Sequence, residues 1–144
     1  MNNPSSFTYV IRSNTASGTA SNDLTLRLNG LPTTTRKFYC EVVDFFVSAQ
    51  QSDLTGYIIE LRADSNMGMI NGRDTSTLAL RTIAFTNTNN TFPQSTYGFY
   101  CENFNGRSIR FQLYDEYQNL LLNKTGGASF NKAWILVLKM TPID

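Results

Sequence analysis

The sequence predicts an all-β sandwich formed by one domain, residues 1–144. Apolar and polar residues alternate with a period of two along most of the chain, and Gly, Pro, Asn, Asp or Ser bounds each alternating segment. Only 16% of the residues are charged, so most of the polarity comes from Ser, Thr and Asn, which favour strands and turns. No window of about 11 residues fits helical spacing better than alternation, and no repeat or linker divides the chain.

The alternating segments predict eight strands, spaced as a sandwich requires. They span residues 7–12, 23–32, 36–51, 56–63, 78–86, 97–104, 108–114 and 132–140. The longest, 36–51, is apolar on both faces, so we expect a central strand that is covered on both sides for part of its length. Within 78–86, alternation places Leu80 and Ala84 on one face and Ile83 and Phe85 on the other.

Three long polar segments, residues 13–22, 64–77 and 87–96, lie between predicted strands. Hairpin loops usually run two to five residues, so loops of this length suit connections that cross from one sheet to the other. We therefore expect a single eight-stranded jelly-roll sandwich of two antiparallel sheets.

Residue types that most enzymes and metal sites depend on are missing. The chain has no histidine, which removes Ser-His and Cys-His nucleophile activation and His metal ligands. Its two cysteines, Cys40 and Cys101, are too few for a disulfide framework and too far apart in sequence for a clustered metal site, so we expect buried apolar side chains. The sequence predicts no enzyme activity, no cofactor, and no catalytic, cofactor-binding or metal-binding residues.

Paired carboxylates could still support glycosidase-type acid-base chemistry if the fold brought two of them together. The candidates are Asp44, Glu60, Asp64, Asp115 and Glu116. We expect Glu60 on a solvated strand face and Asp64 in a turn. Asp44 interrupts an apolar run, so we expect it to pair with an arginine in the sheet or at its edge.

The segment 64–77 offers oxygen ligands for calcium in Asp64, Asn66 and Asp74. It lacks the closely repeated ligand order of an EF-hand, and its glycines lack the Gly-Lys-Ser/Thr ending of a phosphate-binding loop. We expect an ordinary loop.

Charge argues against a nucleic-acid partner. The 12 Lys and Arg residues are scattered and balanced by 11 acidic residues, and the one adjacent basic pair, Arg36-Lys37, is expected to be the charged start of a buried strand. No apolar run approaches the roughly 20 residues of a membrane helix, and the N-terminal segment has no signal-peptide pattern. We expect a soluble chain made in the cytoplasm, with neither specific nucleic-acid binding nor membrane insertion.

The segment SIRFQLYDEYQNLL, residues 108–121, alternates cleanly until the acidic pair Asp115-Glu116 and then becomes apolar again. The pair arrives where the strand ends, and Asn119 follows at hairpin-loop distance. We predict that the pair marks a bend, where Asp115 accepts hydrogen bonds from backbone N–H groups, and has no catalytic role.

This segment also resembles a known family. A strand ending in Asp-Glu, a short turn closing with Asn-Leu-Leu and a final Trp-containing strand resemble the closing hairpin of small jelly-roll capsid proteins. These are the penton (vertex) or minor capsid proteins of large double-stranded DNA viruses, virophages and polinton-like elements. The matching segments are residues 38–48, 109–113, 115–116, 119–121 and 134–138. Many of these proteins have a glycine within the turn, where this chain has Tyr117-Gln118.

The resemblance implies a structural viral capsid protein, most directly the penton subunit, which forms a homopentameric ring at the capsid vertices of the virion. Its partners would be its own copies and the neighbouring major and minor capsid proteins. The polar segments 13–22, 64–77 and 87–96 are the candidates for contacts with neighbours or with the exterior. Such a ring uses heterologous interfaces, in which one side of a subunit binds the opposite side of the next. A net charge of +1 keeps the electrostatic repulsion between copies small.

A carbohydrate-binding or receptor-binding β-sandwich module is the alternative. Tyrosine rings would then stack on the sugars of a host glycan or receptor, while Asn-rich loops bind sugar hydroxyls. The candidate platforms are Tyr57, Tyr97, Tyr100 and Tyr114.

Overall fold

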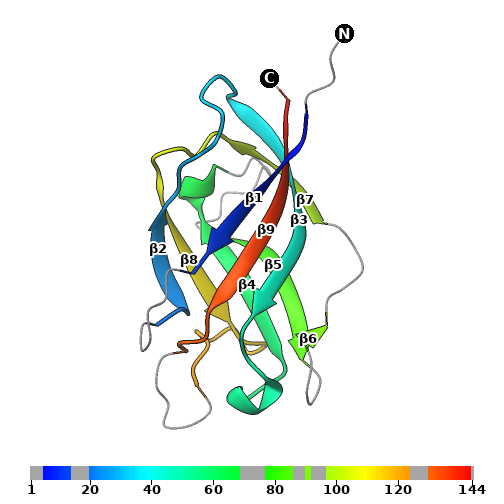
Figure 1. Cartoon of the computed structure of the whole chain (residues 1–144). Helices are drawn as coiled ribbons and strands as arrows, with labels where there is room; N and C mark the ends of the chain where they lie inside the picture. Colours follow the sequence, from blue (N-terminus) through cyan, green and yellow to red (C-terminus); the bar gives the residue numbers. More distant parts are fainter. Residues whose placement is uncertain are drawn as a thin grey trace.

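Two facing antiparallel sheets make up the molecule in the computed structural model, which describes residues 5–13, 20–68, 77–85, 90–91, 97–123 and 130–143. Sheet A has the order β1 (Phe7–Arg12), β9 (Trp134–Pro142), β3 (Lys37–Val47) and β7 (Tyr97–Glu102). Sheet B has the order β2 (Asp23–Arg27), β8 (Ser108–Tyr114), β4 (Ile58–Asp64), β5 (Thr77–Phe85) and the two-residue β6 (Asn90–Thr91). Figure 1 shows β9, in red, between β1 and β3.

Strand connectivity is that of a jelly roll. Each of the first four strands lies in the opposite sheet from the strand before it, as do β7, β8 and β9, whereas β4, β5 and β6 follow one another within sheet B. The predicted eight-stranded jelly-roll sandwich is therefore confirmed, with β6 as a short addition at the edge of sheet B. The helical elements in the described part of the chain are the three-residue turns η1 (Gln51–Asp53) and η2 (Ser65–Met67), and neither is long enough to cross a membrane.

The core lies between the sheets, because alternate side chains of each strand point inward. β4 shows the pattern most simply: Ile59, Leu61 and Ala63 are fully buried, and the residues between them are half-buried. The fully buried strand residues of sheet A include Phe38, Cys40, Val42, Phe45, Phe99, Cys101, Trp134, Leu136, Leu138 and Met140, and those of sheet B also include Ile83, Ile109, Phe111 and Leu113. This continuous apolar layer holds the sheets in place.

Trp134 joins both sheets to the connection between β1 and β2. Its ring lies in the core with centroids 6.2 Å from Phe45 of sheet A and 5.5 Å from Phe111 of sheet B. Its indole Nε1 donates to the backbone oxygen of Ser21 (3.0 Å), and its backbone N donates to Ser13 Oγ (2.9 Å). One buried side chain therefore fixes the spacing of the sheets and the path of the chain that crosses between them.

A bulge in β5 changes which residues face the core. Leu61 pairs with Arg81 and the next residue of β4 pairs with Ala79, so Leu80 is the additional residue on β5. Leu80 is buried together with Ile83 and Phe85, whereas Ala84 is exposed. The prediction that Leu80 and Ala84 share a face was wrong, because strict alternation does not continue through a bulge.

β3 is an interior strand between β9 and β7, as predicted, but its outer face is not covered along its apolar half. A bulge between Val42 and Asp44 shifts its register with β9. On the outer face Val43 and Phe46 are each 46% exposed. The apolar residues on both faces of this strand therefore reflect a core on one side and an exposed apolar surface on the other.

We expect Trp134→Phe to lower the free energy of unfolding by about 2–4 kcal/mol, since it shrinks a core side chain and leaves the Ser21 carbonyl without its donor. Urea unfolding followed by circular dichroism measures this, because the variant lacks the chain's only tryptophan. The control is Ile135→Val, the next residue on β9 and half-buried, for which we expect less than about 1 kcal/mol. Equal effects of the two substitutions would contradict the bridging role of Trp134.

Candidate functional site

The acidic pair closes a turn, residues 115–119, at the end of β8. Asp115 Oδ1 accepts hydrogen bonds from the backbone N of Tyr117 (2.8 Å) and of Asn119 (3.0 Å), and Asp115 N donates to Asn119 O (2.9 Å). Gln118 has a φ of 67°, in the left-handed region that favours glycine. The predicted bend is confirmed, and the Asp115 carboxylate is used to hold it.

Glu116 ties this turn to the start of β4. Both of its carboxylate oxygens accept from the backbone N of Tyr57, at 3.2 and 3.1 Å. The carboxylate lies directly over Gly56, where a Cβ atom would come within 1.9 Å of Glu116 Oε1. A glycine at position 56 is therefore needed for this contact, and both members of the acidic pair serve the fold.

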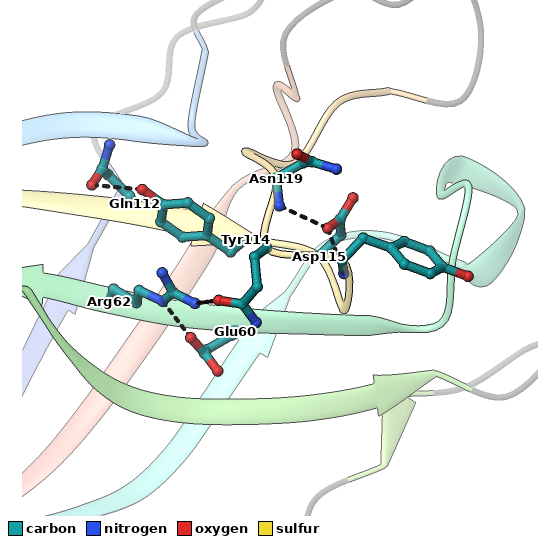
Figure 2. Close-up of polar contacts among 8 residues, drawn as sticks. Glu60, Arg62, Gln112, Tyr114, Asp115 and Asn119 are labelled. Atoms are coloured by element: carbon teal, nitrogen blue, oxygen red, sulfur yellow. Dashed lines mark hydrogen bonds and ion pairs between the residues drawn. The ribbon is translucent and has the colours of Figure 1, made fainter.

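An arginine organises the outer face of sheet B beside the turn, as Figure 2 shows. Arg62 Nε donates to the carboxylate of Glu60, and its terminal nitrogen donates to the side-chain oxygen of Gln118. Its guanidinium carbon lies 4.0 Å from the centre of the Tyr114 ring, a cation–π contact, and Tyr114 donates to Gln112 (3.2 Å). Glu60 is thus paired within the chain, and Arg62 holds the turn against the sheet.

A second polar group lies further along the same face. Arg110 donates two hydrogen bonds to Asp23, at 2.7 and 2.6 Å, and holds the pKa of that carboxyl below its usual range. The backbone N of Arg110 donates to Asp64 Oδ2 (3.1 Å), while Asp64 Oδ1 accepts from the backbone N of Asn66 (3.0 Å) and begins η2. Asp64 is the last residue of β4 and not in a turn as predicted, although its side chain caps the turn η2 that follows, and Asp74 falls outside the described residues.

The candidate carboxylates do not form one acid-base pair. Four of them belong to sheet B or to the turn beside it, and each has the structural contacts given above. The fifth, Asp44, is on the outer face of sheet A, and among the described residues no Arg or Lys nitrogen lies within 4.0 Å of it, so the expected arginine pairing is not found there. Within the same part of the chain, no group of three or more Cys, Asp or Glu side chains is placed to hold a metal ion.

A polar pocket of about 460 Å³ opens at one end of the sandwich. Arg36, Lys37 and Arg107 supply positive charge, and Glu102 accepts from Arg107 at 3.2 Å. The remaining lining residues are Thr33, Thr35, Asn103 and Asn105. The predicted basic pair therefore lies at the exposed start of β3, and the fold adds a third cation from a distant segment.

Asparagine side chains fix the shape of this pocket. Asn105 donates to Leu31 O (2.8 Å) and accepts from Leu31 N (2.9 Å), and Asn103 donates to the carbonyls of Pro32 and Thr35, both at 2.8 Å. These bonds join the loop before β3 to the loop before β8. Because the amides are used within the chain, they are not free to bind a ligand, and the loops are held rigidly.

The tyrosines predicted as sugar platforms do not gather at one place. Tyr100 is 49% exposed on the outer face of sheet A, with its ring 5.0 Å from that of Tyr39. Tyr57 is 52% exposed before β4, and the Tyr114 ring carries the guanidinium described above. The side chain of Tyr97 lies outside the described part.

The outer face of sheet A carries an apolar band across three strands. Val10 pairs with Val137, and Phe46 pairs with Ile135, so these side chains form two adjacent cross-strand rows. Val10 is 39% exposed, and Ile135 and Val137 are half-buried. Exposed apolar patches of this kind are typical of surfaces that bind other proteins.

The two cysteines meet in the core, although 61 residues separate them. They lie diagonally on β3 and β7, since Cys40 pairs with Phe99 and Cys101 with Phe38, and their sulfur atoms are 3.2 Å apart. Both are fully buried, as predicted. The hydrogen bond to Cys101 and the burial raise the pKa of the Cys40 thiol, which stays protonated.

The chain matches no protein-family model, no curated protein and no solved structure. What the protein does has to follow from its own side chains and surfaces. Among the described residues, the outer face of sheet A has apolar side chains that the fold itself does not bury.

For the turn, we expect Asp115→Ala to lower the free energy of unfolding by about 1–2 kcal/mol, because two backbone N–H groups lose their acceptor. Asp115→Asn keeps a side-chain oxygen at the same position and should recover most of the loss. Urea titrations of the three proteins measure the difference. Equal losses for Ala and Asn would contradict the hydrogen-bonding role.

The buried thiol predicts a dependence of stability on pH. The folded Cys40 thiol holds its proton more tightly than the unfolded thiol, whose pKa is about 8.5. Its contribution to the free energy of unfolding is therefore complete below that pH and is lost as the pH rises. We expect a loss of about 1.4 kcal/mol for each pH unit above about 8.5. The double variant Cys40→Ala/Cys101→Ala, less stable overall, should show a shallower slope between pH 8 and 10 in urea titrations. Identical slopes would contradict the effect.

Proposed function

We propose that the protein is a structural capsid subunit, the penton protein that forms a five-fold ring at the vertices of a viral capsid. The observation that carries the proposal is the jelly-roll order of the two sheets, whose edge strands differ on the two sides of the sandwich. Jelly rolls are a standard building block of viral capsids.

Other uses of the jelly roll receive less support. Cupin metal sites bind through histidine, which this chain lacks. A lectin would need aromatic rings and free polar groups at one place, whereas the described tyrosines are spread over both sheets and the pocket asparagines are bonded within the chain. The carbohydrate-binding alternative stays a prediction that a glycan array tests directly.

The two sides of the sandwich fit a ring interface. Sheets A and B end with β1 and β2 on one side, and with β7 and β6 on the other (Figure 1). A ring needs different surfaces on the two sides of each subunit, so that one side of a copy binds the opposite side of the next. The different edge strands provide this asymmetry, and the loops predicted to contact neighbours, 13–22, 64–77 and 87–96, lie largely outside the described residues.

We expect light scattering over a concentration series to give the mass of five copies of the 16.2 kDa chain, about 81 kDa. The fraction in this form should rise with concentration, because the association of copies follows mass action. A strict monomer at all concentrations, or a closed trimer, would contradict the penton proposal. Detection of the protein in purified virions would test its location.

A further inference from the structure

We infer that the outer face of sheet A binds the same face of a second copy of this chain, related by a two-fold axis that runs parallel to the strands between β9 and β3. The inference rests on the proposed function, since an assembling subunit meets its own copies at high concentration. It adds a contact that a five-fold ring does not need. A ring uses the two sides of the sandwich, whereas this contact uses its outer surface.

The first observation is the state of the charges on this face. Arg12 and Lys139 project from β1 and β9, and Glu41 and Asp44 project from β3. Among the described residues no ion pair within 4.0 Å involves any of the four. Arg12 and Lys139 are exposed, Glu41 and Asp44 are half-buried, and all four remain able to pair with another molecule.

The opposite face of the molecule differs in this respect. On the outer face of sheet B, Asp23 is paired with Arg110 and Glu60 with Arg62. These side chains already have partners within the chain, so the face offers less to a neighbour. The contrast selects sheet A as the face that binds.

The second observation is where the charges lie. The bases Arg12 and Lys139 are on β1 and β9, whereas β3 and β7 carry three acids, Glu41, Asp44 and Glu102, against one base, Lys37, so net positive and net negative charge occupy opposite halves of the face. A two-fold axis between β9 and β3 places β9 of one copy opposite β3 of the other. Each basic half then meets an acidic half, which is the self-complementarity that an isologous interface requires.

The register shows which side chains meet. Lys139 and Glu41 share one cross-strand row, and Ile135 and Phe46 share another. The axis therefore brings Lys139 opposite Glu41 of the second copy, and Ile135 opposite Phe46 of the second copy, each contact occurring twice. Facing sheets lie about 10 Å apart, a gap that extended lysine and glutamate side chains span together.

A second copy fits this face better than an unrelated partner does. The strands of this face carry three positive and three negative charges, so the face does not select a partner of one charge. An acidic or a basic protein would leave one half of the face opposite like charge, which costs affinity. A copy of the chain matches both halves at once.

The test uses two single variants, Lys139→Glu and Glu41→Lys. Alone, each variant places like charges opposite each other across the axis and weakens its homodimer. Mixed, the two variants form a heterodimer in which both rows have opposite charges. We expect the mixture to associate at least about tenfold more tightly than either variant alone, by sedimentation equilibrium at low salt with one variant isotopically labelled for native mass spectrometry.

A change in the stability of either variant does not produce tighter association on mixing. Lys139 and Glu41 are also neighbours within one chain, but each variant has the same intramolecular charges in the mixture as it has alone. Trp134 fluorescence verifies that each variant is folded. The matched control exchanges charges on the other face, with Asp23→Arg mixed with Arg110→Asp, and should give no gain on mixing.

A mixture that associates no more tightly than its separate components would overturn the inference. The penton ring and the two-fold contact can be contradicted independently of each other. A wild-type pentamer that neither Lys139→Glu nor the mixture affects would keep the penton proposal and exclude this contact. A wild-type dimer without a pentamer, weakened by each variant and restored by mixing, would establish the contact and exclude the ring.

Discussion

The fold depends on burying β9 between β1 and β3 with Trp134 at its start. This strand places Leu136, Leu138 and Met140 in the core, and the indole reaches across the core to Phe111 of sheet B. The indole Nε1 of the same side chain donates to the backbone oxygen of Ser21 and so holds the connection between β1 and β2. One strand thus sets the spacing of the sheets, the path of the first connection between them and the position of the central strands.

The two outer faces differ in how many of their polar groups are bonded within the chain. Much of the polar surface of sheet B is bonded within the chain: the turn at residues 115–119 is held by Asp115, attached to the sheet by Arg62 and anchored to β4 by Glu116. Sheet A leaves apolar rows and unpaired charges outside. A protein that needed only to fold would have little reason for that difference, whereas a subunit that buries one face against a neighbour would have one.

Much of the architecture could be predicted from alternation alone, because period-two patterns and loop lengths depend on local residues. The bend at Asp115 was also predictable, since an acidic residue at a strand end is typical of a turn. Alternation could not locate the bulge that carries Leu80, because an added residue is decided by packing across the sheet. Nor could it place Cys40 beside Cys101, which requires the register of β3 with β7. The left-handed backbone conformation of Gln118 could not be predicted from its residue type, because the neighbouring residues impose that conformation.

The position of β9 also has a consequence for the order of events during synthesis. Residues 7–12 pair with residues 135–140, so the first and the last of the described strands are neighbours. While the ribosome is still making the chain, β1 and β3 have no strand between them, and the outer face of sheet A does not yet exist as a continuous surface. Pairing over such a long sequence separation is slow and comes late. Nascent chains on one messenger RNA therefore lack the surface through which finished copies would meet, which keeps folding ahead of assembly.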